Sequence, residues 1–122
     1  FPFMALNRNL KRNGKISSAN MARINRALGT PTNEWRSALY LPNPQLSLPF
    51  GESPPKKVSI EDIRKYILAR LKATFPTVSP KAAFLYNKKK SPQFLLCFAG
   101  SNPSRAARDL SLKGADHILK DI

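Results

Sequence analysis

The clearest pattern of apolar and polar positions lies in residues 59–74, where apolar side chains recur at helical spacing and basic side chains occupy the opposite face. Ser59 followed by Glu61 and Asp62 is typical of a helix start, because acidic side chains in the first turn meet the positive end of the helix dipole. Pro76 favours a helix end, since the residue before a proline avoids helical backbone. We predict one helix over this range, with an apolar face of Ile60, Ile63, Ile67, Leu68 and Leu71.

Two short apolar runs follow, over Ala82–Tyr86 and Gln93–Ala99. The polar and basic residues between them predict a β-hairpin with a loop longer than a two-residue turn. The second run contains the sequence FLLCFA, which is apolar at successive positions. We therefore expect this strand to be covered on both of its faces.

A last helix is expected over about 103–113. Ser101 or Asn102 would cap it, and Gly114 would end it. Residues 115–122 fit either a final helical turn or a short closing strand. The predicted order from residue 58 onward is α-β-β-α, and the last helix is expected to face inward with Ala106, Ala107 and Leu110.

The first forty residues are polar, basic and weakly helical. Residues 19–28 predict a short helix that Ser17 or Ser18 would cap and that Gly29 would end. A second short helix is expected over Pro31–Tyr40. Residues 7–15 show no apolar period, so we expect this arm to be disordered in the isolated protein.

Five prolines between residues 41 and 57 prevent a helix or a central strand from running through that segment. The predicted organisation is a basic N-terminal extension with short helices (1–40), a Pro-rich linker (41–57) and a small α+β domain (58–122). The fold class is therefore α+β: a small C-terminal α-β-β-α domain with a basic, Pro-bearing, partly helical N-terminal extension.

Charge is the strongest feature of the composition. The 122 residues include 21 Lys and Arg against 7 Asp and Glu, a formal net charge of +14. Residues 1–57 and residues 58–122 each carry a net charge of +7, so the charge is not confined to a tail. Charge of this size is usually screened by nucleic acid, where each cation set against a phosphate releases counterions.

The sequence argues against catalysis, so we predict a protein that is not an enzyme, with no catalytic residues, no cofactor and no metal site. Cys97 lies in an apolar run where burial suppresses the thiolate, and it is the one cysteine of the chain. The single histidine, His117, cannot form a two-histidine metal centre. The acidic pair Glu61 and Asp62 is explained by helix capping, and Asp116 with Asp121 is a second pair near the end of the sequence. No stretch approaches the length of a transmembrane helix.

Basic residues at three places are candidate RNA contacts. The tip of the predicted hairpin carries three consecutive lysines, and the N-terminal arm interleaves basic residues with Asn and Ser. The turn Gly100–Arg105 opens a helix, where exposed backbone N–H groups can hold a phosphate. Tyr86 precedes the lysines and could stack on an unpaired base or lie in the core. The candidate RNA-binding residues are Arg8, Lys11, Arg12, Lys15, Arg23, Arg26, Lys88, Lys89, Lys90, Arg105 and Arg108.

These features predict a structural RNA-binding subunit of a large ribonucleoprotein, which acts by phosphate neutralisation and RNA packing. The basic proline-bearing extension and small α+β domain resemble ribosomal proteins in composition, which implies rRNA and neighbouring proteins as partners, an intracellular location and a cytosolic or mitochondrial ribosome as the assembly. Two alternatives stay open: a non-catalytic accessory subunit of a protein or membrane-associated assembly, and a small DNA-packaging protein. No small-molecule substrate is expected.

Overall fold

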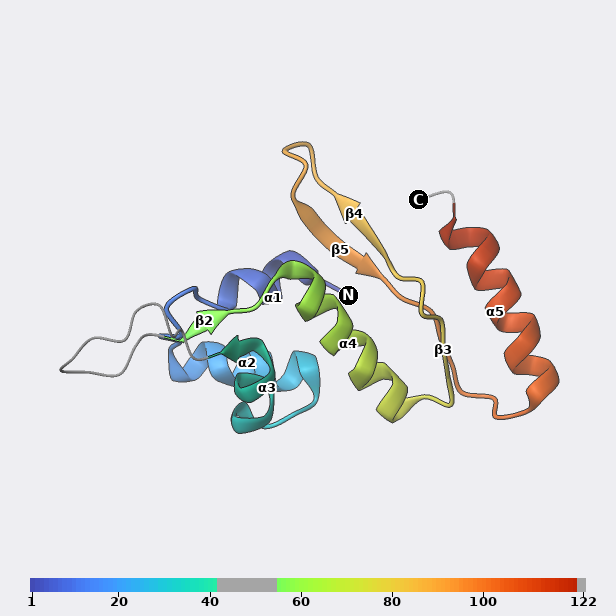
Figure 1. Ribbon diagram of the computed structural model, residues 1–122, viewed down its shortest axis with the longest axis horizontal. Coiled ribbons are helices and arrows are strands. Elements are labelled where there is room, and N and C mark those ends of the chain that lie inside the picture. Colours follow the sequence, from blue (N-terminus) through green and yellow to red (C-terminus); the bar gives the residue numbers. More distant parts are fainter. Residues whose placement is uncertain (42–54, 121–122) are drawn as a thin grey trace. The chain divides into compact units, whose positions relative to one another are not determined.

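The structure is a computed structural model that describes residues 1–41 and 55–120 (Figure 1). These residues form helices and three small antiparallel sheets of two strands each, so the predicted α+β class is confirmed. The elements in chain order are α1 (Phe3–Asn9), α2 (Ser18–Leu28), α3 (Thr32–Leu39), β1 (Tyr40–Leu41), β2 (Lys56–Lys57), α4 (Ile60–Thr74), β3 (Thr77–Val78), β4 (Ala83–Tyr86), β5 (Pro92–Leu96), β6 (Ala99–Gly100) and α5 (Arg105–Leu119).

The chain forms two compact units, which we describe separately. The N-terminal unit comprises Ala5–Tyr66. The hairpin unit comprises Phe1–Met4 together with Ile67–Ile122. Both α1 and α4 contribute residues to each unit. The domain limits at residues 40 and 57 stay a prediction.

Helices α2 and α3 form the centre of the N-terminal unit, and both were predicted. The Ser17 Oγ accepts a hydrogen bond from the backbone N–H of Asn20 at 3.2 Å and so caps α2. At the other end Gly29 adopts the left-handed conformation that favours glycine, with φ 67°. The indole N–H of Trp35 on α3 donates to Asn25 on α2, and the Trp35 side chain is fully buried. Ile24, Leu28 and Leu39 complete this small core.

The N-terminal arm is ordered, which contradicts our expectation of disorder over residues 7–15. Helix α1 extends to Asn9, and the side chains of Leu6, Leu10 and Ile16 are buried. Phe3, Leu6 and Leu10 are spaced as a helical stripe, so α1 has a continuous apolar face that the surrounding basic residues obscured in the sequence. The arm carries its own share of the core because burial of these side chains outweighs the entropy of ordering the segment.

The strands β1 and β2 pair antiparallel across the Pro-rich segment, with Tyr40 opposite Lys57 and Leu41 opposite Lys56. The backbone N–H of Val58 continues this pairing with a hydrogen bond to the carbonyl of Leu39 at 3.0 Å. The last residues of the predicted linker are therefore part of a strand. Residues 42–54 lie outside the described part of the chain.

The hairpin unit is built on β4 and β5, which confirms the predicted hairpin. Phe84 lies opposite Leu95, and Leu85 lies opposite Phe94. The backbone of Phe1 pairs with the other edge of β5 through two hydrogen bonds of 2.9 Å to Leu95. The ring of Phe3 packs edge-on against Phe84, with 4.9 Å between ring centroids. One face of the hairpin is therefore covered by the start of the chain.

The other face of the hairpin is open, so the expectation that β5 is covered on both sides is wrong. Leu95 is fully buried, but its neighbours Phe94 and Leu96 are 46% and 36% exposed. Successive strand residues point to opposite faces, and the described residues cover only the Leu95 side. The adjoining pair of β3 with β6, in which Thr77 lies opposite Gly100, was not predicted.

Helix α5 runs through Gly114 to Leu119, so it is longer than predicted. Ser104 rather than Ser101 or Asn102 is its N-cap, and its hydroxyl accepts from the N–H of Ala107 at 3.2 Å. The inward side chains are Ala115 and Leu119. The predicted inward residues Ala106 and Leu110 are exposed, Leu110 by 74%. Burial of the last turn stabilises the helix by more than the roughly 1 kcal/mol that a helical glycine costs.

We expect Gly14→Ala to lower the free energy of unfolding of the N-terminal unit by about 1–2 kcal/mol or more. Gly14 has a φ of 72°, and an added Cβ would lie 2.7 Å from Cγ of Pro55. Urea unfolding followed by the fluorescence of the buried Trp35 measures the change. The matched variant is Gly114→Ala, where no described atom lies within 4 Å of the added Cβ. That helical substitution should stabilise the protein by about 0.5–1 kcal/mol, measured by circular dichroism. An unchanged midpoint for Gly14→Ala would contradict the turn described here.

Candidate nucleic-acid interface

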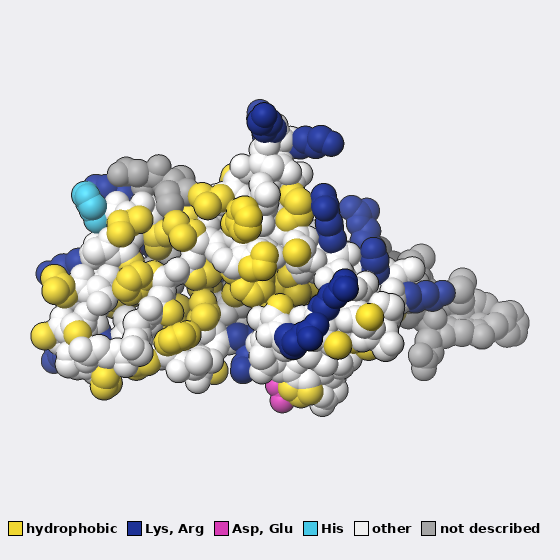
Figure 2. Space-filling view, turned by 180° about the vertical axis from the view of Figure 1, so that it is seen from behind, with side chains coloured by type: hydrophobic (Ala, Val, Ile, Leu, Met, Phe, Trp, Pro, Cys, Tyr) yellow, Lys and Arg dark blue, Asp and Glu magenta, His cyan; other side chains and the backbone are white. Residues whose placement is uncertain are grey.

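All eleven predicted RNA-binding residues have exposed side chains. Six of them belong to the N-terminal unit and five to the hairpin unit. Figure 2 shows Lys and Arg side chains gathered on the N-terminal unit and at the tip of the hairpin. Their positions within each unit decide which of them can act together.

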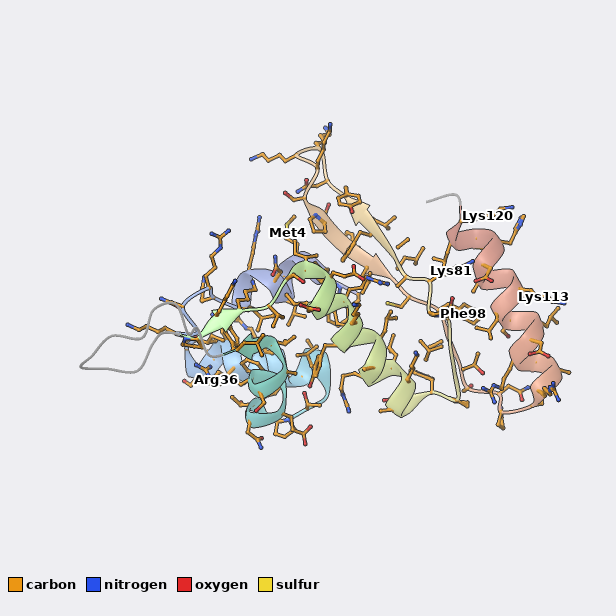
Figure 3. The ribbon with its side chains drawn as sticks, viewed as in Figure 1. Met4, Arg36, Lys81, Phe98, Lys113 and Lys120 are labelled. Atoms are coloured by element: carbon orange, nitrogen blue, oxygen red, sulfur yellow. The ribbon has the colours of Figure 1, made fainter. Side chains whose placement is uncertain are left out.

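The loop Lys11–Lys15, between α1 and α2, presents three of these residues: Lys11, Arg12 and Lys15. The Tyr40 hydroxyl donates a hydrogen bond to the carbonyl of Lys11 at 2.6 Å. Arg36, labelled in Figure 3, donates from its guanidinium to the carbonyl of Gly14. The same guanidinium carbon lies 5.5 Å from the centre of the Tyr40 ring. Tyr40 and Arg36 therefore hold the loop by its backbone, and the basic side chains point out from a fixed support.

Lys57 joins this loop although it is more than forty residues further along the chain. Its ammonium group donates to the carbonyl of Asn7 at 2.9 Å. Burial, with the positive charges of Arg12 and Lys11, lowers the pKa of Lys57 from its ordinary value. Lys11, Arg12 and Lys57 thus form a basic cluster, in which the first two charges act on the third. No described carboxylate lies within ion-pair distance of these three side chains.

Sequence reasoning missed Lys57 because it assigned this residue to the Pro-rich linker. The position of Lys57 within range of the Arg12 charge depends on the β1–β2 pairing, which joins residues from the two ends of that segment. The Lys56-Lys57 doublet at the end of the prolines was the one available signal.

The hairpin tip is the second basic site, and its loop is held by Asn87. The Asn87 side-chain oxygen accepts from the backbone N–H groups of Lys89 at 2.9 Å and Ser91 at 3.0 Å. The Lys90 backbone is left-handed, with φ 59°, and its N–H bonds to the carbonyl of Asn87. Lys88, Lys89 and Lys90 are all exposed. The loop therefore presents three ammonium groups on an internally bonded turn.

The five remaining candidate residues lie on helices, and Arg8 is exposed in the last turn of α1. Arg23 and Arg26 are exposed on α2, and Arg105 and Arg108 are exposed in the first turn of α5. The predicted phosphate site in the turn before α5 depended on free backbone N–H groups, and two of these groups already have acceptors within the protein. The backbone N–H of Ser104 already bonds to Asn102 at 3.0 Å, and the N–H of Ala107 bonds to Ser104. These arginines can contact a polyanion only as exposed charges.

The described acidic side chains that were considered for catalysis form hydrogen bonds or ion pairs within the protein. Asp62 bonds to the Ser59 hydroxyl at 3.0 Å, and the backbone N–H of Asp62 bonds to the same hydroxyl, as the predicted helix cap requires. The hydrogen bond from Arg64 lowers the pKa of Glu61. Asp116 forms an ion pair with Lys81 at 3.6 Å, and both Lys81 and α5 are visible in Figure 3. Asp121 lies outside the described residues.

Cys97 and His117, the other two residues considered for chemistry, lie apart from any cluster of ligands. Cys97 is half-buried with its sulfur 3.9 Å from the carbonyl oxygen of Leu95, so its expected full burial is not observed. His117 is exposed on α5. Among residues 1–41 and 55–120, no three His, Cys, Asp or Glu side chains are grouped as a metal site would need. None of the helices in this part of the chain is both long and apolar enough to cross a bilayer.

No protein family, curated protein or solved structure matches this chain. The interpretation of the basic sites therefore depends on their own geometry and charge.

The lowered pKa of Lys57 gives a pH dependence of known sign. Between that pKa and the ordinary value near 10.5, the unfolded chain binds more protons than the folded protein, so stability rises with pH. We expect the unfolding free energy of the wild type, measured relative to Lys57→Gln, to be constant near pH 7 and to increase above the lowered pKa. Urea titrations monitored by Trp35 fluorescence at several pH values up to about 10.5 would measure this difference.

The comparison with Lys57→Gln is needed because Tyr40 titrates in the same range. Burial raises the pKa of Tyr40, and this contribution falls as pH rises. Both proteins contain Tyr40, so the difference between them isolates Lys57. A difference that does not change with pH, or that decreases, would show that folding does not lower the pKa of Lys57.

Proposed function

We propose that this protein is a structural RNA-binding subunit of a large ribonucleoprotein, without catalytic activity of its own. The observation that supports this most is the basic cluster of Lys11, Arg12 and Lys57, which the fold holds together without a described carboxylate partner. Like charges fixed in this way destabilise the isolated protein, and a polyanion would relieve the repulsion. A ribosome, cytosolic or mitochondrial, is the kind of assembly we propose.

The proposed mechanism is phosphate neutralisation by pre-positioned cations. Tyr40 and Arg36 fix the backbone of the loop, so little ordering entropy is lost when Lys11 and Arg12 meet phosphates. In this mechanism the lysine and arginine side chains of the loop and the hairpin tip contact phosphates, which position a protein on nucleic acid without reading its sequence. The protein would therefore select RNA by the spacing and shape of its phosphates, and neighbouring proteins of the assembly would add further contacts.

Replacing Lys11 and Arg12, the two exposed members of the cluster, together with the exposed Arg8 of α1 tests this function. We expect Arg8→Gln/Lys11→Gln/Arg12→Gln to weaken binding to a structured RNA and to reduce the slope of log K against log salt by roughly one unit per lost phosphate contact. The control is Lys72→Gln/Lys113→Gln/Lys120→Gln, which removes the same charge from exposed positions on α4 and α5. Filter binding at several salt concentrations measures both. Equal losses in the two triple variants would mean that total charge alone matters.

The hairpin tip makes a separate prediction. We expect Lys88→Gln/Lys89→Gln/Lys90→Asn to reduce the salt slope by up to about three units and to leave the fold intact. Asn at position 90 keeps the left-handed backbone, because Asn tolerates that conformation. Lys113 and Lys120, labelled on α5 in Figure 3, lie away from the tip within the same unit, so the control above applies here too. If the slope of log K against log salt were unchanged in the tip variant, the three lysines would not contact RNA and the tip would be only a solvated turn.

A further inference from the structure

Tyr86 is an exposed aromatic ring at the base of the lysine tip. It is the last residue of β4, and its side chain is 63% exposed. The ring has an aromatic neighbour, because its centroid lies 6.2 Å from that of Phe84 with the two planes tilted by 58°, and Phe84 in turn packs on the fully buried Phe3. An exposed ring held on a row of packed rings loses little freedom when a flat ligand covers it.

The register of the hairpin places Tyr86 on a defined face. Leu85 lies opposite Phe94, so these two side chains share one face of the β4–β5 pair. The register shifts between Leu85 and Tyr86, which pairs with Pro92, and the ring contact with Phe84 places Tyr86 on the opposite face, where Phe3 also packs. Each face of the hairpin therefore presents one exposed ring, with Tyr86 on the aromatic face and Phe94 among the aliphatic side chains of Leu85 and Leu96.

The lysines of the tip lie close to the Tyr86 ring along the chain. The Cα of Lys88 is two residues from that of Tyr86, at most about 7.6 Å away. The side-chain oxygen of Asn87, between them, accepts from the backbone N–H groups of Lys89 and Ser91 and so closes the turn. A ring for a base and ammonium groups for the adjoining phosphates thus occur on one short, internally bonded segment.

We propose that Tyr86 and Lys88–Lys90 form a binding site for an unpaired nucleotide, whose base stacks on the Tyr86 ring while its flanking phosphates contact the lysines. The inference rests on the proposed RNA-binding function and adds the class of RNA, namely a single-stranded loop or bulge. In a duplex, base faces are covered by their neighbours, so an aromatic ring can stack only on a base that is unstacked. Lysines alone would bind duplex and single strand alike.

The experiment compares a 12-nucleotide uridine oligomer with a 12-base-pair RNA duplex as ligands of the full chain. We expect Tyr86→Leu to weaken binding of the single strand by about 5- to 150-fold, the value of one stacked base, and to change duplex binding less than about twofold. The salt slope should not change, because no phosphate contact is removed. Tyr86→Phe, which keeps the ring, should bind the single strand like the wild type.

Phe94→Leu is the matched control, since it removes an exposed ring from the opposite face of the same hairpin without a change in charge. It should leave binding of both RNAs unchanged. Equal losses for Tyr86→Leu and Phe94→Leu, a loss for Phe94→Leu alone, or no loss for Tyr86→Leu would each overturn the proposal.

A measurement on the wild-type protein covers the case in which a Tyr86 variant fails to fold. An oligomer with abasic nucleotides in place of the uridines keeps the phosphates but has no base to stack. We expect it to bind more weakly than the uridine oligomer by a similar factor, and equal binding of the two would overturn the inference. If the wild type binds both RNAs but does not distinguish these oligomers, the inference fails and the proposed function stands. If it binds neither RNA, the proposed function itself is wrong.

Discussion

Burial of the apolar side chains in the first ten residues is the interaction on which both units depend. Phe3 covers one face of the β4–β5 hairpin, and Leu6 and Leu10 are buried in the N-terminal unit. Each such side chain contributes about 1.5–3 kcal/mol as an upper estimate. Short helices and two-stranded sheets are marginal without burial of this kind. The segment that anchors the fold carries Arg8 and leads directly into Lys11 and Arg12, so its packing helps to fix the position of the strongest basic site.

The fold places like charges together and does not neutralise them from within. The ammonium group of Lys57 donates to the carbonyl of Asn7, and burial together with the positive charges of Arg12 and Lys11 lowers its pKa. A protein selected only for its own stability would be expected to offset such a cluster with a carboxylate, as Asp116 offsets Lys81. An external anion that supplies the missing charge accounts for the arrangement, because stability lost in the free protein is then recovered on binding.

Local signals predicted the elements that they control. The capping residues Ser17, Gly29 and Ser59 mark α2 and α4, and both helices were predicted within a residue or two. Long-range contacts controlled the rest: α5 passes through Gly114 because Ala115 and Leu119 are buried, and the two-residue pairs β1–β2 and β3–β6 have no local pattern. The basic sites also differ in whether local sequence or long-range contacts determine them. Exposure of the lysine tip followed from its sequence, whereas the approach of Lys57 to Arg12 required the β1–β2 pairing.

Charge and aromatic stacking make different demands on a ligand, and the hairpin combines them. Attraction to phosphates is long-ranged, salt-dependent and almost indifferent to sequence, so it collects RNA without orienting it. Stacking on the exposed Tyr86 ring acts only at contact and requires an unstacked base, because the faces of paired bases are covered by their neighbours. A tip with lysines alone would slide along any phosphate backbone. A tip with lysines and a fixed ring can hold one point of a folded RNA, and a fixed point is what a structural subunit needs in order to position its neighbours.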